Sequence, residues 1–237
     1  MKMPKVSIIL PIHNAAQTLN RAIDSVINQT FTDWELICVI NLCNDNSKEL
    51  AQLSATFDNR IRVIECAEKG IVPALNCGIL HSNGEFIARQ DADDYWYKDK
   101  LEKQIKFLES FQNIDIVGTQ IRQVDPKNFE VVPSQIRYPL NDREIKRTLL
   151  TGSNCIAHPS VVFRKRIIYR AGLYDDTYPL AEDYYYWLRC IRWYNFANLT
   201  DTLVDYTSNP NPNYDPRVPL QACQNIHDLY RQIGIIK

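Results

Sequence analysis

Residues 85–94 read Glu-Phe-Ile-Ala-Arg-Gln-Asp-Ala-Asp-Asp and place three carboxylates directly after a short apolar segment. The segment from Glu85 to Gln90 is predicted to be a buried strand. Carboxylate oxygens are the ligands that Mg²⁺ and Mn²⁺ prefer, so Asp91 and Asp93 are candidate ligands of a cation shared with a phosphate-bearing substrate. The same acids also suit a solvated turn that caps a helix beginning near Lys98, and Asp-x-Asp alone does not separate the two.

Apolar strands and amphipathic helices alternate on both sides of this stretch. Strands are predicted at residues 6–12, 34–40, 61–65, 85–90 and 114–124, and helices at residues 16–29, 47–57, 72–81 and 98–111. This alternation predicts an α/β fold, a Rossmann-like and mostly parallel sheet flanked by helices. Ligands of such sheets bind at the carboxyl ends of the strands. Polar residues follow four of the strands at that edge, namely His13-Asn14, Asn41, Glu68-Lys69 and Asp91 to Asp94.

The second half of the chain has a different pattern, because the alternation stops at a proline-flanked connection over residues 133–139. Beyond it we expect a smaller lobe, with a helix at 141–150, a strand at 160–164, a turn at 172–176 and a helix at 182–193. Prolines over 209–216 exclude a helix or a central strand, so this run is predicted to be a surface loop before a last helix at 220–233. The expected parts are therefore residues 1–132, 133–206 and 207–237.

Composition narrows the class of protein. The chain has 237 residues, of which 45% are hydrophobic and 23% charged, and this suits one domain with at most a small appended lobe. A formal net charge of −1 and the lack of a DNA- or RNA-binding signature argue against a nucleic-acid partner. Seven cysteines without a Cys-x-x-Cys pair indicate reduced thiols and a cytoplasmic protein. The apolar stretch before His13 is too short for a signal peptide or a membrane span.

Several segments in a fixed order resemble one enzyme family. They are Val6-Ser-Ile-Ile-Leu-Pro-Ile-His-Asn14, Ser25-Val-Ile-Asn-Gln-Thr-Phe31, Lys69-Gly-Ile-Val-Pro-Ala-Leu-Asn76, Ile87-Ala-Arg-Gln-Asp-Ala-Asp-Asp94, His158-Pro-Ser160, Ala181-Glu-Asp-Tyr184 and Trp187-Leu-Arg189. No single segment is decisive. Their order and spacing over about 200 residues resemble a family 2 glycosyltransferase of the GT-A fold, with the second half of the chain as the acceptor-side lobe.

The resemblance implies a hexosyltransferase that uses a nucleotide-diphosphate sugar, with UDP-sugars as the default donors. Asp91-Ala92-Asp93 matches the family element that contacts the donor. There Asp91 would bind a ribose hydroxyl and Asp93 the Mn²⁺ or Mg²⁺, with Asp91 as the second possible metal ligand. Such a cation would stabilise the nucleoside diphosphate as it leaves.

The resemblance also assigns residues to the nucleotide pocket. Pro11, His13 and Asn14 match the segment that lines the base, where His13 either stacks on the base or caps the following helix. Lys69 matches a basic or polar position near the nucleotide, although a lone surface lysine is the simpler interpretation. Asn41 stands near a position at which the family usually has an acid facing the base. An asparagine donates and accepts hydrogen bonds, so we expect it to contact the base differently, and the identity of the nucleotide stays open.

The acid pair Glu182-Asp183 is the candidate catalytic centre. Deprotonation of an acceptor hydroxyl requires a carboxylate on the face opposite the leaving diphosphate. Asp183 matches the family's general base and Glu182 its neighbour, whereas acids stabilised by the dipole of a helix are the plain alternative. Further possible acceptor contacts are Asp94, His158, Tyr184 and Trp187, of which His158 is equally compatible with a structural role.

The sequence thus predicts a metal-dependent, inverting glycosyltransferase acting on a glycan, lipid-linked or protein-linked acceptor. The alternative is a catalytically degenerate glycosyltransferase-like module that binds a nucleotide or glycan. It follows from two departures from the family, the missing acid at Asn41 and Thr207 after Tyr206, where the family often has arginine and histidine. A sugar-phosphate nucleotidyltransferase is disfavoured, since residues 11–22 contain no glycine for a phosphate-binding loop. The last helix, apolar at Ile226 and Tyr230, would cover the core or a partner subunit.

Overall fold

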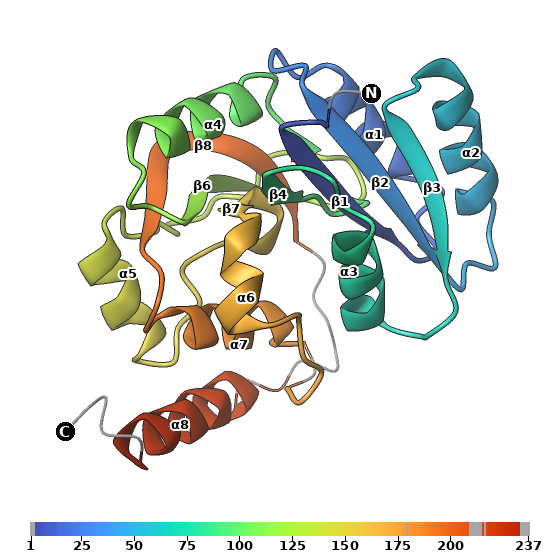
Figure 1. Cartoon of the computed structure of the whole chain (residues 1–237). Coiled ribbons are helices and arrows are strands. Elements are labelled where there is room, and N and C mark those ends of the chain that lie inside the picture. Colours follow the sequence, from blue (N-terminus) through green and yellow to red (C-terminus); the bar gives the residue numbers. More distant parts are fainter. Residues whose placement is uncertain (1–2, 179, 209–214, 216, 233–237) are drawn as a thin grey trace.

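The chain folds as one eight-stranded sheet with helices packed on both faces (Figure 1). The computed structural model describes residues 3–178, 180–208, 215 and 217–232. Most of the surface loop predicted at 209–216 therefore lies outside the described residues.

The strands and helices follow the alternation expected from the sequence. The strands are β1 (Val6–Ile12), β2 (Trp34–Asn41), β3 (Ile61–Cys66), β4 (Phe86–Arg89), β5 (Tyr95–Trp96), β6 (Ile116–Val124), β7 (Val162–Arg164) and β8 (Phe196–Thr207). The α-helices are α1 (Leu19–Ile27), α2 (Ser47–Phe57), α3 (Ile71–Leu80), α4 (Lys100–Ser110), α5 (Asp142–Leu149), α6 (Ile168–Ala171), α7 (Glu182–Cys190) and α8 (Arg217–Gln232). Short 3₁₀ helices occupy His158–Ser160 and Lys165–Ile167.

The sheet has the order β3-β2-β1-β4-β7-β6-β8-β5. The strands β1 to β4, β6 and β8 run in one direction, and only β5 and β7 run against it. The predicted α/β fold class with a mostly parallel sheet is confirmed. Because β1 and β4 lie next to each other in the middle of the eight-stranded sheet, ligands are expected in the crevice at their carboxyl ends.

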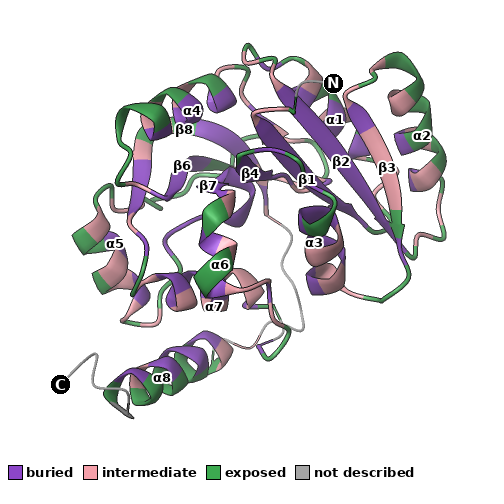
Figure 2. Ribbon diagram, viewed as in Figure 1, coloured by how far each residue is buried: buried purple, intermediate pink, exposed green. Residues whose placement is uncertain are grey.

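Two hydrophobic cores hold the helices against the sheet. Side chains alternate across a strand, and in β1 the residues Ile8 and Leu10 enter one core while Ile9 enters the other. Helices α1, α2 and α4 cover the first core, and α3, α5, α6, α7 and α8 cover the second. Figure 2 shows the buried sheet between helices whose outer faces are exposed. The parallel strands therefore read as continuous apolar runs rather than as alternating ones.

Two strands of the second half belong to the main sheet. The strand predicted at 160–164 in the smaller lobe is β7, and it lies between β4 and β6. It begins at Val162, because residues 158–160 form a 3₁₀ turn. The long strand β8 was not predicted as an element of its own and pairs with β6 along its length. The second half of the chain is thus built on the same sheet as the first half.

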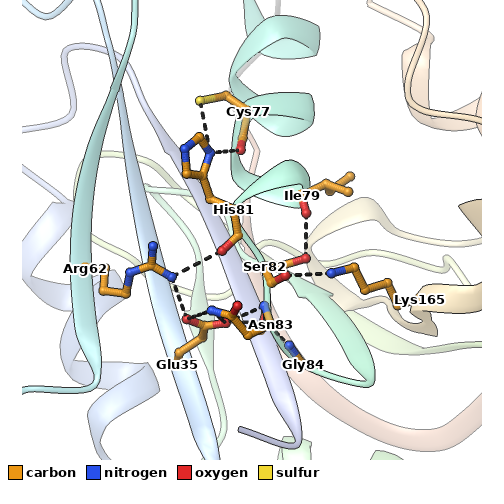
Figure 3. Close-up of polar contacts among 10 residues, drawn as sticks. Glu35, Arg62, Cys77, Ile79, His81, Ser82, Asn83, Gly84 and Lys165 are labelled. Atoms are coloured by element: carbon orange, nitrogen blue, oxygen red, sulfur yellow. Dashed lines mark hydrogen bonds and ion pairs between the residues drawn. The ribbon is translucent and has the colours of Figure 1, made fainter. Parts of the chain in front are cut away.

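A polar cluster closes the amino-terminal edge of the sheet (Figure 3). The Glu35 carboxylate accepts hydrogen bonds from Ser7 Oγ at 2.7 Å, from the Asn83 backbone N–H at 2.7 Å and from Arg62 Nη1 at 2.9 Å. Burial acts to raise the pKa of Glu35, but these hydrogen bonds outweigh it and hold the pKa below its usual range. The cluster fixes the turn between α3 and β4, which leaves the opposite edge for ligands.

The last helix covers the protein's own core. Ala222, Ile226 and Tyr230 of α8 are buried, and the Tyr230 hydroxyl donates a hydrogen bond to the carbonyl of Leu188 at 3.0 Å. None of the helices that the structure describes has the length and apolar character needed to cross a membrane.

Candidate active site

The predicted site residues gather around three adjoining cavities at the carboxyl edge of the sheet. Cavity A, of about 220 Å³, lies between the ends of β1 and β2 and the start of α3. Cavity B, of about 490 Å³, is lined by residues 13–18 and by the turn after β4. Cavity C, of about 680 Å³, lies between that turn and the start of α7. Cavities A and B share Pro11 and His13, and cavities B and C share Asp91.

Cavity A contains most of the residues assigned to the nucleotide base. It is lined by Pro11, Ile12, His13, Asn41, Lys69, Gly70, Ile71 and Ala74. The ring of His13 hydrogen-bonds through Nδ1 to the Asn41 carbonyl at 2.7 Å, so its orientation is fixed by the end of β2. Asn14, which the sequence placed with these residues, lines cavity B instead.

The Asn41 side chain holds the loop between β3 and α3. Its Nδ2 donates to the Glu68 carbonyl at 2.6 Å, and its Oδ1 accepts from the Gly70 N–H at 3.0 Å. Gly70 has a φ of 124°, a backbone conformation that other residues rarely adopt, and it leads directly into α3. The predicted contact between Asn41 and a base therefore competes with its role in shaping the wall of cavity A.

The acids after β4 form a compact cluster, here named the acid turn. Asp91, Asp93 and Asp94 each place a carboxylate oxygen within 4.8 Å of the others. Asp94 is buried, with one oxygen accepting from the Thr207 N–H at 2.7 Å and the other, Oδ2, lacking any hydrogen-bond partner among the described residues. Burial, together with the charges of Asp91 and Asp93, raises the pKa of Asp94 well above its usual range. The carboxylates of Asp91 and Asp93, held together beside this buried acid, offer hard oxygen donors that fit a divalent cation.

Neighbouring elements fix the backbone of the acid turn. Thr18 Oγ1, from the start of α1, donates to the Ala92 carbonyl at 2.8 Å. Thr207 Oγ1, from the end of β8, donates to the Asp93 carbonyl at 2.5 Å. Thr207 thus takes a structural role at the position where the family often has a basic residue, and nothing in the sequence pattern around it indicated this contact.

Arg89 is one residue of the site to which the sequence analysis assigned no role. Its guanidinium is buried, lines cavity C and contacts the Asp91 carboxylate. Burial alone would lower the pKa of Arg89, but Asp91, Asp94 and Glu182 raise it overall, so the charge is retained. A charged residue inside an otherwise apolar strand must be paired, and that signal was present in the quoted stretch.

Glu182 and Asp183 face the acid turn across cavity C. Burial, reinforced by the charge of Asp183, raises the pKa of Glu182 to about 7. Burial also raises the pKa of Asp183, against two hydrogen bonds that favour its ionised form. These come from the Tyr184 N–H at 2.6 Å and from Asn154 Nδ2 at 2.7 Å. Asn154, another residue that the sequence analysis missed, thus orients the Asp183 carboxylate.

His158 lies in the wall of cavity C beside these acids. Its Nε2 is 3.0 Å from the Tyr174 hydroxyl, and its Nδ1 is 4.0 Å from Glu182 Oε1. Burial, with a further contribution from Arg89, holds the pKa of His158 well below its usual range, so the ring is neutral at pH 7. Because the His158 ring is neutral, it does not offset the negative charge of an ionised Glu182.

Three of the residues predicted to contact an acceptor do not reach the cavity. Tyr184 is buried and donates its hydroxyl hydrogen to the Leu149 carbonyl at 2.6 Å, and Trp187 is also buried in the second core. Residues 184, 187 and 188 share one face of α7, and that face packs inward. Asp94 is buried under the acid turn. The aromatic residues that line cavity C are Tyr138 and Tyr206.

Comparison with known proteins gives a consistent result. The family model for "Glycosyl transferase family 2" matches residues 7–172. The "O-antigen biosynthesis glycosyltransferase WbnJ" of Escherichia coli is 33% identical over 210 residues, which cover 85% of this chain and 78% of that protein. The "Putative glycosyltransferase EpsE" of Bacillus subtilis is 38% identical over 118 residues, which cover 49% of this chain and 42% of that protein.

Solved structures show the same fold at lower sequence identity. The structure of S. aureus TarS in complex with UDP-GlcNAc superposes with a TM-score of 0.73 at 19% identity, covering 94% of this chain and 65% of that one. The mannosyltransferase PcManGT from Pyrobaculum calidifontis, in complex with GDP-Man and Mn²⁺, gives a TM-score of 0.67 at 19% identity, covering 90% of this chain and 59% of that one. The likeness at this identity concerns the fold.

Proposed function

The chain belongs to glycosyl transferase family 2 and is a glycosyltransferase, and from this premise we propose that it is metal-dependent and inverts the anomeric configuration. The proposed donor is a nucleotide-diphosphate sugar, with a UDP-hexose as the first choice, and the acceptor is a hydroxyl of a glycan. The observation that carries this proposal is that the acid turn and the acid pair open into the same cavity. Asp91, Glu182 and Asp183 all line cavity C.

The donor would lie along cavities A and B, with its base near Pro11 and His13 and its diphosphate near the acid turn. In support, the TarS and PcManGT structures that share this fold contain UDP-GlcNAc and GDP-Man. Asp91 and Asp93 would hold the Mn²⁺ or Mg²⁺, and the cation when bound would neutralise charge on the departing diphosphate. Asp94 has one oxygen fixed by Thr207, so we assign it to the support of the turn.

The reaction proposed for this site is a direct displacement. An acceptor hydroxyl oxygen attacks the anomeric carbon, the bond from that carbon to the diphosphate oxygen breaks, and the hydroxyl proton passes to Asp183. Asn154 orients the Asp183 carboxylate and leaves its charge available. Glu182, with a pKa of about 7, is a mixture of protonated and ionised forms at neutral pH and is assigned as the neighbour of the base.

A melting experiment with nucleotides tests the donor half of the proposal. A ligand that binds only the folded state raises stability by RT ln(1 + [L]/Kd), so we expect a rise with UDP that depends on Mn²⁺. Comparison with GDP, TDP and CMP identifies the base. Asp93→Ala should remove the dependence on Mn²⁺, whereas the exposed acid variant Asp176→Asn should not.

The catalytic half is tested by measuring the UDP that is released when the hexose of a UDP-hexose is transferred to water or to an added glycan. Asp183→Asn should abolish this release and leave nucleotide binding within a few-fold of wild type. Substantial residual turnover would refute Asp183 as the base. No Mn²⁺-dependent binding of any nucleotide, together with no turnover, would instead favour the degenerate binding module.

A further inference from the structure

Tyr174 is a buried residue that contacts the wall of cavity C and has no role in the reaction proposed above. It follows α6 in the chain, and its backbone is held from α3 by the Asn76 side chain. Asn76 Nδ2 donates to the Tyr174 carbonyl at 2.9 Å, and the Tyr174 N–H donates to Asn76 Oδ1, also at 2.9 Å. This two-point clamp joins residues 98 positions apart, so it fixes the place from which the Tyr174 side chain extends.

The ring of Tyr174 is fixed as well. It stacks on the Tyr186 ring of α7, with the ring centroids 4.2 Å apart and 18° between the planes. Its hydroxyl is 3.0 Å from Nε2 of His158, the only hydrogen-bond partner of that hydroxyl among the described residues. The His158 ring is also buried, 5.4 Å from the Tyr174 ring and 6.2 Å from the Trp187 ring. Packing on both sides therefore holds Tyr174 and His158 in contact.

This contact determines which nitrogen of His158 carries the proton. A neutral imidazole has one donor nitrogen and one acceptor nitrogen, and a buried hydroxyl requires an acceptor for its hydrogen. In the part of the chain that the structure describes, Nε2 is the only acceptor within reach of the Tyr174 hydroxyl. Nε2 therefore accepts, and the proton lies on Nδ1. The opposite arrangement, with Nε2 donating to the tyrosine oxygen, would leave a buried O–H without an acceptor.

The Nδ1 side of the His158 ring is the side next to the acid pair. Nδ1 is 4.0 Å from Oε1 of Glu182. This separation exceeds a hydrogen bond, but catalytic hydrogen bonds often shorten only when substrate binds. With its proton on Nδ1, His158 offers a donor to an ionised Glu182. With the proton on Nε2, it would present a lone pair that repels that carboxylate.

We propose that Tyr174 is a positioning residue of the transfer reaction, because its hydroxyl fixes His158 in the tautomer that donates from Nδ1 to Glu182. Asn154 holds the neighbouring Asp183 by a hydrogen bond at 2.7 Å. Each carboxylate of the acid pair thus has its own donor in the wall of cavity C. Glu182 is then presented to the acceptor in one orientation beside the base. The inference deepens the proposed function and rests on it for the effect on transfer, but not for the tautomer.

NMR of the protein labelled with ¹⁵N-histidine tests the tautomer without turnover, since the ¹⁵N chemical shift separates a protonated ring nitrogen from an unprotonated one. His158→Gln identifies the His158 signals among those of the four histidines. In wild type we expect the proton on Nδ1. Tyr174→Phe removes the hydroxyl but keeps the ring and the backbone clamp, so the ratio of the Nδ1 to the Nε2 tautomer should fall roughly two- to tenfold. Tyr186→Phe is the matched control, because its hydroxyl donates instead to the Gly172 carbonyl at 3.1 Å, and it should leave the ratio unchanged.

Steady-state kinetics test the effect on transfer. Tyr174→Phe should lower kcat for transfer from a UDP-hexose several-fold. The Kd of UDP in the presence of Mn²⁺ should stay as in wild type, because Tyr174 lines neither cavity A nor cavity B. Tyr186→Phe should change neither quantity. A hydroxyl with a merely structural role would instead give Tyr174→Phe a lower melting temperature with the tautomer and the kcat of wild type.

A proton on Nε2 of wild-type His158, whether or not Nδ1 also carries one, would overturn the inference. An equal tautomer ratio in wild type and in Tyr174→Phe would overturn it too, and a wild-type kcat in a Tyr174→Phe protein whose tautomer has changed would refute the positioning role. If wild type shows neither Mn²⁺-dependent UDP binding nor turnover, the proposed function is wrong and the positioning role falls with it. The tautomer ratio then still decides whether Tyr174 fixes His158, so the two failures are distinguishable.

Discussion

Glu182→Gln should make the protein more stable at alkaline pH, and the size of the effect follows from the site. The Glu182 carboxyl is buried, and it lies beside Asp183, Asp91 and a neutral His158, so its ionised form is disfavoured first by burial and then by the neighbouring charges. The pKa of Glu182 is raised in the folded protein from 4.5 to about 7. The folded state therefore holds this proton more tightly than the unfolded state does.

The sign of the pH dependence follows directly. Between pH 4.5 and 7 the unfolded chain loses the Glu182 proton first, so the free energy of unfolding falls as pH rises and levels off above pH 7. At about 1.4 kcal/mol for each pH unit, the raised pKa of Glu182 costs about 3 kcal/mol at pH 8. For a chain of this length that corresponds to roughly 6–12 °C in melting temperature. A neutral glutamine removes this cost.

Thermal melts from pH 4 to pH 8 in a chelating buffer measure the difference between Glu182→Gln and wild type. We expect the difference to favour the variant increasingly as pH rises, whatever its value at pH 4. Glu49→Gln, an exposed acid on α2, is the control and should follow wild type throughout. Asp183→Asn should reduce the effect, because Asp183 is a main charge acting on Glu182. A difference that does not change with pH would refute the reasoning.

Three further outcomes are expected. Asn41→Ala loses the hydrogen bonds to Glu68 and Gly70, so we expect it to destabilise the protein by about 1–3 kcal/mol and to weaken UDP binding; thermal melts measure the loss of stability and calorimetry measures the weaker binding. Glu35→Gln should destabilise the protein by about 2 kcal/mol at pH 7, and this loss should shrink as the pH falls below 4.5, because the lowered pKa of Glu35 stabilises the folded state only while the acid is ionised. Thermal melts measure the loss, and UDP binding should be unchanged. A pH-independent loss of stability would contradict this account. Mn²⁺ binding at pH 7 should release protons, because the raised pKa values of Asp94 and Glu182 favour their protonated forms before the cation binds. The release is measured as a binding heat that differs between buffers of different ionisation enthalpy. No release would show that these raised pKa values are unconnected with the metal.

The fold was predictable from the sequence where local pattern decides it. The strands β1 to β4 are apolar runs between turn residues, and the intervening helices have apolar residues at helical spacing. The placement of β7 between β4 and β6 was not predictable, because the pairing joins residues 86–88 to 162–164. A strand of three residues carries too little pattern to specify its partner. β8 was missed because its middle contains the polar residues Thr200 to Thr202, where its pairing with β6 shifts register.

The acids of the site were predictable because carboxylates crowded together at the end of a buried strand repel one another unless a cation or a proton joins them. The structure brings Asp91 and Asp183 to one cavity, as the sequence pattern anticipated. The direction in which the neighbouring side chains point was not predictable. Tyr184 and Trp187 follow the acids in sequence, yet helical geometry turns both into the core. Asn154 and Thr207 act through hydrogen bonds to residues far away in the chain, and a single asparagine or threonine carries no sequence signal of such a contact.

Charge balance explains why Arg89 lies at the centre of this site. The acids near its guanidinium or beside the acids that touch it are Asp91, Asp93, Asp94, Glu182 and Asp183. Five negative charges around one buried cation are untenable in a medium of low dielectric constant, and the raised pKa values of Asp94 and Glu182 show protons making up part of the difference. The positive charge of Arg89 is permanent, whereas the protons on Asp94 and Glu182 exchange with solvent. A divalent cation bound at Asp91 and Asp93 would therefore displace protons and leave Arg89 in place, which is why we expect its binding to release protons.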